Sequence, residues 1–185
     1  MSLTQQQAAE ALEEIASTER QVAMSNGYRT GSPHFLLWGV IWTLGYEASY
    51  LYPEQTQWIW VALDLIGAAG GMILARKANP APGAANRESW RFMGAFLVVG
   101  AFIGAVYYIF APHTLAQFGA LPPLVLALIY TWMGLFNGPR LLLTGGTLLV
   151  LTLVGYVFLL PWFLPWIGFA GGGTLVLTGL WLRRA

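Results

Sequence analysis

Six apolar stretches, each close to 20 residues long, dominate the sequence. A helix needs about 20 mainly apolar residues to cross the hydrocarbon core of a bilayer, so each stretch is long enough to span it. We predict spans at residues 34–52, 57–75, 92–111, 120–137, 141–160 and 164–182. Since open sheet edges and irregular backbone are excluded from hydrocarbon, the pattern predicts an all-α membrane protein of six transmembrane helices arranged as three hairpins.

The composition supports this class of protein. Hydrophobic residues make up 57% of the 185-residue chain and charged residues 9%, whereas a soluble domain has about a quarter of its residues charged. Nine Trp and eight Tyr suit the aromatic belts at the two membrane surfaces. A net charge of +1 argues against a nucleic-acid partner, which would require a concentrated basic face.

The basic residues predict the orientation of the bundle. With six spans, all nine Lys and Arg fall on one side, and the positive-inside rule makes that side cytoplasmic. We therefore expect both termini in the cytoplasm. The loops on the opposite side are short, at residues 53–56, 112–119 and 160–166.

An amphipathic helix is predicted before the first span, over residues 4–25. Leu12, Ile15 and Val22 share one face, with Glu and Gln on the other, so these three are candidate partner contacts. Three roles fit this segment, which can cap the bundle, lie on the membrane or dock a partner. Its acidic rather than Lys-rich polar positions favour contact with protein over contact with anionic lipid.

Helix-boundary signals separate this helix from the bundle. The pair Asn26-Gly27 is a typical helix stop, and Ser32-Pro33 is a typical helix start. We therefore predict two parts, a cytoplasmic helix and linker over residues 1–31 and a six-helix bundle over residues 32–185.

Glycines recur at the spacing that lets membrane helices approach closely. The predicted packing positions are Gly67, Gly71, Gly100, Gly104, Gly168 and Gly172. Packing within the bundle and a seam between copies both fit this pattern, so a homo-oligomer is a candidate partner beside another protein.

Two acids interrupt the apolar spans, Glu47 in the first and Asp64 in the second. At 1.5 Å per residue, each lies roughly 10 Å below the outer surface. An acid in hydrocarbon is costly and usually has a partner, but no Lys or Arg is available at this depth. We predict that the acids face each other with Tyr46 and Tyr50 nearby. They act either as hydrogen-bonded contacts between helices or as a proton or cation site, unless another subunit supplies a positive charge.

Signatures of enzymes are missing from the sequence. It has no Cys, and Asp64 is its only Asp, so thiol chemistry and a two-aspartate protease within one chain are excluded. No zinc-binding helix, nucleophile elbow or phosphate-binding loop appears. We therefore expect no catalytic residues, no metal site and no cofactor.

The segments ALEEIASTERQ, HFLLWGVIWTLGY and GGGTLVLTGLWLRRA resemble those of small bacterial inner-membrane proteins that pair a short acidic helix with several spans. The resemblance implies a location and carries no activity or functional residues. We predict a non-enzymatic accessory, assembly or regulatory protein that acts through helix contacts and cytoplasmic partners. The alternative is a small proton- or cation-coupled transporter or channel that uses Glu47 and Asp64.

Overall fold

The structure is a computed structural model that describes residues 5–78 and 84–184. Every element in these ranges is helical, which confirms the predicted all-α class. The long helices are α1 (Gln5–Leu51), α2 (Thr56–Ala78), α3 (Ala84–Phe110), α4 (Leu115–Asn137), α5 (Pro139–Phe158) and α6 (Phe163–Leu182). Two short 3-10 helices, η1 (Pro53–Gln55) and η2 (Leu160–Trp162), form the turns that precede α2 and α6.

Five segments of the described chain are long and apolar enough to cross a membrane. They are Pro53–Ala78, Ser89–Phe110, Leu115–Asn137, Pro139–Phe158 and Leu160–Leu182. This finding is compatible with a membrane location. The predicted first span, at residues 34–52, is not among the five, since His34, Glu47 and several Trp and Tyr residues lower its mean hydropathy.

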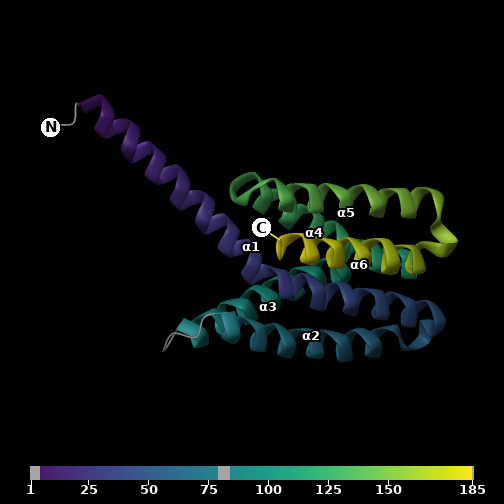
Figure 1. The fold of residues 1–185 in the computed structure, drawn as a ribbon. Helices are drawn as coiled ribbons and strands as arrows, with labels where there is room; N and C mark the ends of the chain where they lie inside the picture. Colours follow the sequence, from purple (N-terminus) through teal and green to yellow (C-terminus); the bar gives the residue numbers. More distant parts are fainter. Residues whose placement is uncertain (1–4, 79–83, 185) are drawn as a thin grey trace.

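The first helix is continuous, so the predicted break between an N-terminal helix and the first span is wrong. The 47 residues of α1 include Asn26, Gly27, Ser32 and Pro33 without interruption. Figure 1 shows the N-terminal half of α1 extending away from the other five helices, while its C-terminal half lies within the bundle. We call residues 12–31, in the N-terminal half of α1, the arm.

Tertiary contacts explain why these signals do not end the helix. A Gly within a helix costs only about 1 kcal/mol relative to Ala, and Pro33 removes one hydrogen bond. Ser32 is fully buried against α6, where its Oγ donates to the Gly179 carbonyl at 2.7 Å. Packing on α6 therefore holds the backbone helical at the point where the sequence signals a start.

The strongest helix packing does not follow the three predicted hairpins, which would pair α1 with α2, α3 with α4 and α5 with α6. The most extensive contacts join α1 to α6 and α4 to α5, while α3 and α4 touch only slightly. Figure 1 shows α6 between α1 and α5. The side chains buried at the centre include Tyr46, Leu148, Phe163, Ile167 and Leu175. The core of the bundle therefore lies between α1, α4, α5 and α6, and α3 lies at its edge.

Four of the six predicted packing glycines lie at close helix contacts. A methyl group placed at Gly172 would lie 2.8 Å from the Gly39 carbonyl oxygen, and one at Gly168 would lie 3.0 Å from Tyr46 Cβ. Similar contacts place Gly67 against Trp38 and Gly71 against Phe92.

Gly100 and Gly104 of α3 make no close contact within the described part of the chain. A methyl group at either would meet no atom of the described residues within 4 Å. The reason is that α3 is peripheral and has an open face on this side, so the spacing of its glycines is not used for packing within the chain.

Candidate functional site

Tyr46 is the largest fully buried side chain in the described part of the chain. Its ring lies edge-on to Trp42 of the same helix and to Trp60 of α2, with centroid distances of 5.8 and 5.0 Å. Its hydroxyl donates to the carbonyl oxygen of Gly119 in α4 at 2.8 Å. Tyr46 therefore connects α1, α2 and α4.

This hydrogen bond compensates for a proline. In an α-helix the N–H of residue i+4 donates to the carbonyl of residue i, and a proline has no N–H to donate. Pro122 and Pro123 lie inside α4, so the carbonyls of Phe118 and Gly119 lose their usual donors. Tyr46 donates to the Gly119 carbonyl.

Tyr107 of α3 compensates in the same way for Pro122, the first of the two prolines. Its hydroxyl donates to the Phe118 carbonyl at 2.5 Å, and its ring packs on the Phe118 ring with a centroid distance of 4.2 Å. Two tyrosines from different helices thus supply the two hydrogen bonds that the consecutive prolines remove. Buried backbone carbonyls need such partners most in a bilayer, where water is absent.

Asp64 of α2 lies beside these tyrosines, within electrostatic range of both Tyr46 and Tyr107. A phenol has a single O–H to donate, and both tyrosines direct theirs to α4 carbonyls. Neither can donate to the Asp64 carboxyl at the same time. Each phenol oxygen can still accept a hydrogen bond.

Glu47 has different surroundings, on the side of α1 that faces α6. A methyl group placed at Gly168 would lie 3.2 Å from Glu47 Oε1. This oxygen is buried and has no hydrogen-bond partner, although the side chain as a whole is partly exposed. One turn earlier, Thr43 Oγ1 is within hydrogen-bonding distance of the carbonyls of Gly39, at 3.0 Å, and Gly168, at 3.1 Å.

The two acids therefore do not face each other across the first hairpin, as their matched depth predicted. Gly45 of α1 faces α2, because a methyl group there would meet Trp60 and Leu63. Glu47 follows two residues later, about 200° further around the helix, since each residue turns by about 100°. Depth is set by position along the chain, but the facing direction depends on which neighbour packs against each side of the helix.

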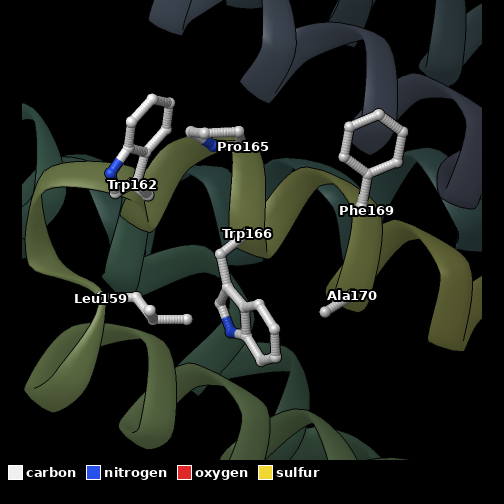
Figure 2. Close-up of a pocket in the computed structure, with 6 residues that line it drawn as sticks. All are labelled: Leu159, Trp162, Pro165, Trp166, Phe169 and Ala170. Atoms are coloured by element: carbon white, nitrogen blue, oxygen red, sulfur yellow. The ribbon is translucent and has the colours of Figure 1, made fainter.

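The predicted Tyr50 lies near the C-terminal end of α1 and is partly exposed. Its ring packs on that of Trp162 in η2, with a centroid distance of 5.8 Å. Trp162 is one of six residues that line a wide-open apolar hollow along η2 and α6, the others being Leu159, Pro165, Trp166, Phe169 and Ala170. Figure 2 shows Pro165 and Phe169 on the opposite side of α6 from Trp166 and Ala170.

The three predicted partner contacts all lie on the arm. The exposed fractions are 67% for Leu12 and 55% for both Ile15 and Val22. Glu13, Glu14 and Glu19 around them are exposed as well. The described residues thus leave this apolar face uncovered by the chain itself.

The joint between arm and bundle is formed by residues that the sequence patterns did not single out. The Arg140 guanidinium lies 5.4 Å from the centroid of the Tyr28 ring and 5.1 Å from that of Trp181. Arg140 also donates to the Trp181 carbonyl at 3.0 Å. The sequence predicts only that Arg140 lies on the cytoplasmic side, and no spacing rule relates it to Tyr28, 112 positions earlier in the chain.

We expect Arg140→Ala to loosen this joint. Loss of two cation–π contacts and a hydrogen bond removes on the order of 1–2 kcal/mol that holds the arm in one direction. Because the chain has no native Cys, spin labels at Ser17→Cys and Ala78→Cys report the distance between arm and bundle. The distance distribution is expected to broaden in Arg140→Ala and to stay narrow in the control Arg183→Ala, whose side chain is exposed. Equal broadening in the two variants would show that Arg140 does not fix the arm.

No group of three or more His, Cys, Asp or Glu in the described residues is placed to hold a metal ion. His34 instead packs on Phe92, with ring centroids 5.0 Å apart. Comparisons with protein-family models, with curated proteins and with solved structures gave no match to this chain.

Proposed function

We propose that this chain is a six-span protein of the bacterial inner membrane that docks a protein partner through its cytoplasmic arm. In this role it is a non-enzymatic accessory, assembly or regulatory component. One observation carries the proposal, the continuity of α1 from the arm into the buried centre of the bundle. A partner bound to the arm is thereby coupled to a helix that packs along α6.

The surface of the arm defines the chemistry of the partner. An exposed stripe of Leu12, Ile15 and Val22 suits a helix-in-groove mode of binding, in which apolar side chains about one turn apart fill a hydrophobic groove. The exposed Glu19 lies on the same face of the helix as the stripe, one turn after Ile15, and the exposed Glu14 flanks that face. We infer a partner whose apolar groove is edged by Lys or Arg, since complementary charge directs association.

A photo-crosslinking amino acid at Ile15 is expected to capture one partner in reproducible stoichiometry in cells. The same amino acid at Ser17, which is also exposed but lies on the opposite face of the helix, is the matched control. Substituting Leu12, Ile15 and Val22 together by Ser is expected to reduce co-purification of that partner by at least about tenfold, as for loss of a central apolar anchor. Equal capture from both positions, or co-purification that survives the triple substitution, would reject the docking face.

The proposed orientation has a separate test. With six spans and both termini in the cytoplasm, reporter fusions after residues 55, 113 and 161 are expected to give periplasmic signals, and those after residues 78 and 138 cytoplasmic signals. The positive-inside distribution of all nine Lys and Arg is the physical reason. A periplasmic signal at residue 78 would overturn the proposed topology, and a cytoplasmic N-terminus found together with it would show that α1 does not cross the membrane.

A second candidate function, proton- or cation-coupled transport, is favoured by one observation at Glu47. A buried carboxylate oxygen with no hydrogen-bond partner is costly in a bilayer unless the group is protonated or meets a cation. Asp64, the second acid of this candidate function, is within electrostatic range of Tyr46 and Tyr107. Flux into proteoliposomes that is lost in Glu47→Gln supports transport, and flux that is unchanged rejects it.

A further inference from the structure

We propose that a hollow between α3, α4 and α5 binds a lipophilic quinone, a flat uncharged ring that carries two carbonyl oxygens and an apolar tail. The site rests on the proposed membrane location, since such a ligand reaches the protein from the bilayer. It does not involve the arm, so the quinone site and the docking function can fail separately.

The hollow lies where α3 and α4 touch only slightly. It is partly open and has a volume of about 330 Å³, within the range of small-molecule sites, roughly 300–1,000 Å³. Its lining comes from the C-terminal turns of α3, the loop that follows, the first turns of α4, and Tyr156 near the C-terminal end of α5. Three helices therefore contribute to it at the same end of the bundle.

The polar side chains of the hollow are gathered at this end. They are Tyr107, His113, Gln117 and Tyr156, and each lies in the loop or within about one turn of a helix end. Deeper along α4 the lining is apolar, and its last residue, Leu124, lies roughly 10 Å beyond Gln117 along the helix axis. This order fits an amphiphile whose head lies level with the helix ends and whose tail points into the bilayer.

Two of the polar groups are held in place and are free to donate. Gln117 Oε1 accepts from the backbone N–H groups of His113, at 2.8 Å, and Thr114, at 3.2 Å, while its amide N–H groups have no acceptor in the described part of the chain. The Tyr156 hydroxyl has no partner there either, and its ring lies edge-on to Phe163 with a centroid distance of 5.7 Å. A neutral His113 imidazole adds one more N–H.

These groups favour an uncharged ligand that accepts hydrogen bonds. None of the described residues that line the hollow is Lys, Arg, Asp or Glu, so a charged head such as a phosphate would be left without a counter-charge. Because the Gln117 amide oxygen is already occupied, this side chain can only donate, and carbonyl oxygens are its natural partners. Tyr107, Phe110 and Tyr156 supply aromatic surface, against which a flat ring can pack. A quinone combines these properties.

The test measures equilibrium binding of a fully substituted benzoquinone with a decyl tail to the full-length protein in mild detergent, with protein-free micelles as the blank. Saturable binding is expected, weakened about tenfold in Gln117→Glu, because the amide donor becomes a carboxylate that only accepts. Glutamate keeps the oxygen that caps α4, as either residue can in a capping box. The start of the helix is therefore preserved in this variant.

Two controls separate the site from general effects. Gln55→Glu makes the same chemical change in the exposed turn η1, outside the hollow, and it is expected to bind the quinone normally. Decanol has the same tail without the carbonyl-bearing ring, and it is expected not to compete.

A second variant keeps the proposal testable if Gln117→Glu does not fold. Val106→Trp fills the hollow from the peripheral helix α3 without changing a polar group, and it is expected to abolish binding. Binding that is equal in the wild type, Gln117→Glu and Val106→Trp would overturn the site. Full competition by decanol would overturn the quinone as its ligand, since only the apolar tail would then be recognised.

Discussion

Gly172→Ala is expected to destabilise the protein by about 1–3 kcal/mol relative to Gly173→Ala, the usual cost of overpacking. A methyl group at Gly172 would lie 2.8 Å from the Gly39 carbonyl oxygen and 3.0 Å from the Thr43 amide nitrogen. Both are backbone atoms of α1, so relief requires the two helices to separate. This contact joins α1 to α6, one of the two most extensively packed pairs of helices in the bundle.

The neighbouring glycine makes the comparison clean. A methyl group at Gly173 would meet no atom of the described residues within 4 Å. Both substitutions gain the same helix propensity of about 1 kcal/mol, so the difference between the variants isolates packing. Reversible unfolding in mixed micelles measures it, and equal stabilities would contradict the observed contact between α1 and α6.

Tyr46→Phe is expected to cost about 1–3 kcal/mol, because it leaves the buried Gly119 carbonyl without a donor. The loss follows from the missing N–H of Pro123, so restoring that N–H is expected to reverse it. In the double variant Tyr46→Phe/Pro123→Ala, the amide of residue 123 can donate to the Gly119 carbonyl, as in an uninterrupted helix. Most of the lost stability is expected to return.

The rescue is specific to one proline, because each proline deprives a different carbonyl, four residues earlier, of its N–H donor. Pro122→Ala provides an amide for the Phe118 carbonyl, which Tyr107 serves. It is therefore expected to rescue Tyr107→Phe and not Tyr46→Phe. Double-mutant cycles on unfolding free energies measure both couplings. Rescue of Tyr46→Phe by either proline substitution alike would show that general relaxation of α4, and not the missing hydrogen bond, is responsible.

The candidate site was only partly predictable from the sequence. Glu47 and Asp64 stood out because charge is rare in apolar spans, and Tyr46 stood out by its nearness to Glu47. The hydrogen bond from Tyr46 to α4 was not predicted. The pair Pro122-Pro123 indicates that such a bond is needed, because two consecutive prolines inside a helix leave two carbonyls without their usual N–H donors. Nothing in the sequence states which helix delivers the tyrosines that satisfy them.

The sequence alone determined the all-α class and the positions of α2 to α6. The reason is that an apolar run long enough to cross the hydrocarbon core can satisfy its backbone hydrogen bonds there as a helix. The spacing of the glycines also showed where another helix can approach closely. The tertiary structure decided whether a helix packs at such a position, as α1 does at Gly172 and as no described helix does at Gly104. It likewise decided that α1 continues through Gly27 and Pro33, where burial of Ser32 against α6 outweighs local signals worth a few kcal/mol. Local helix propensity acts over single turns, whereas the contact between α1 and α6 joins residues more than 100 positions apart. The arrangement of the bundle therefore depends on long-range packing, which no short stretch of sequence can predict.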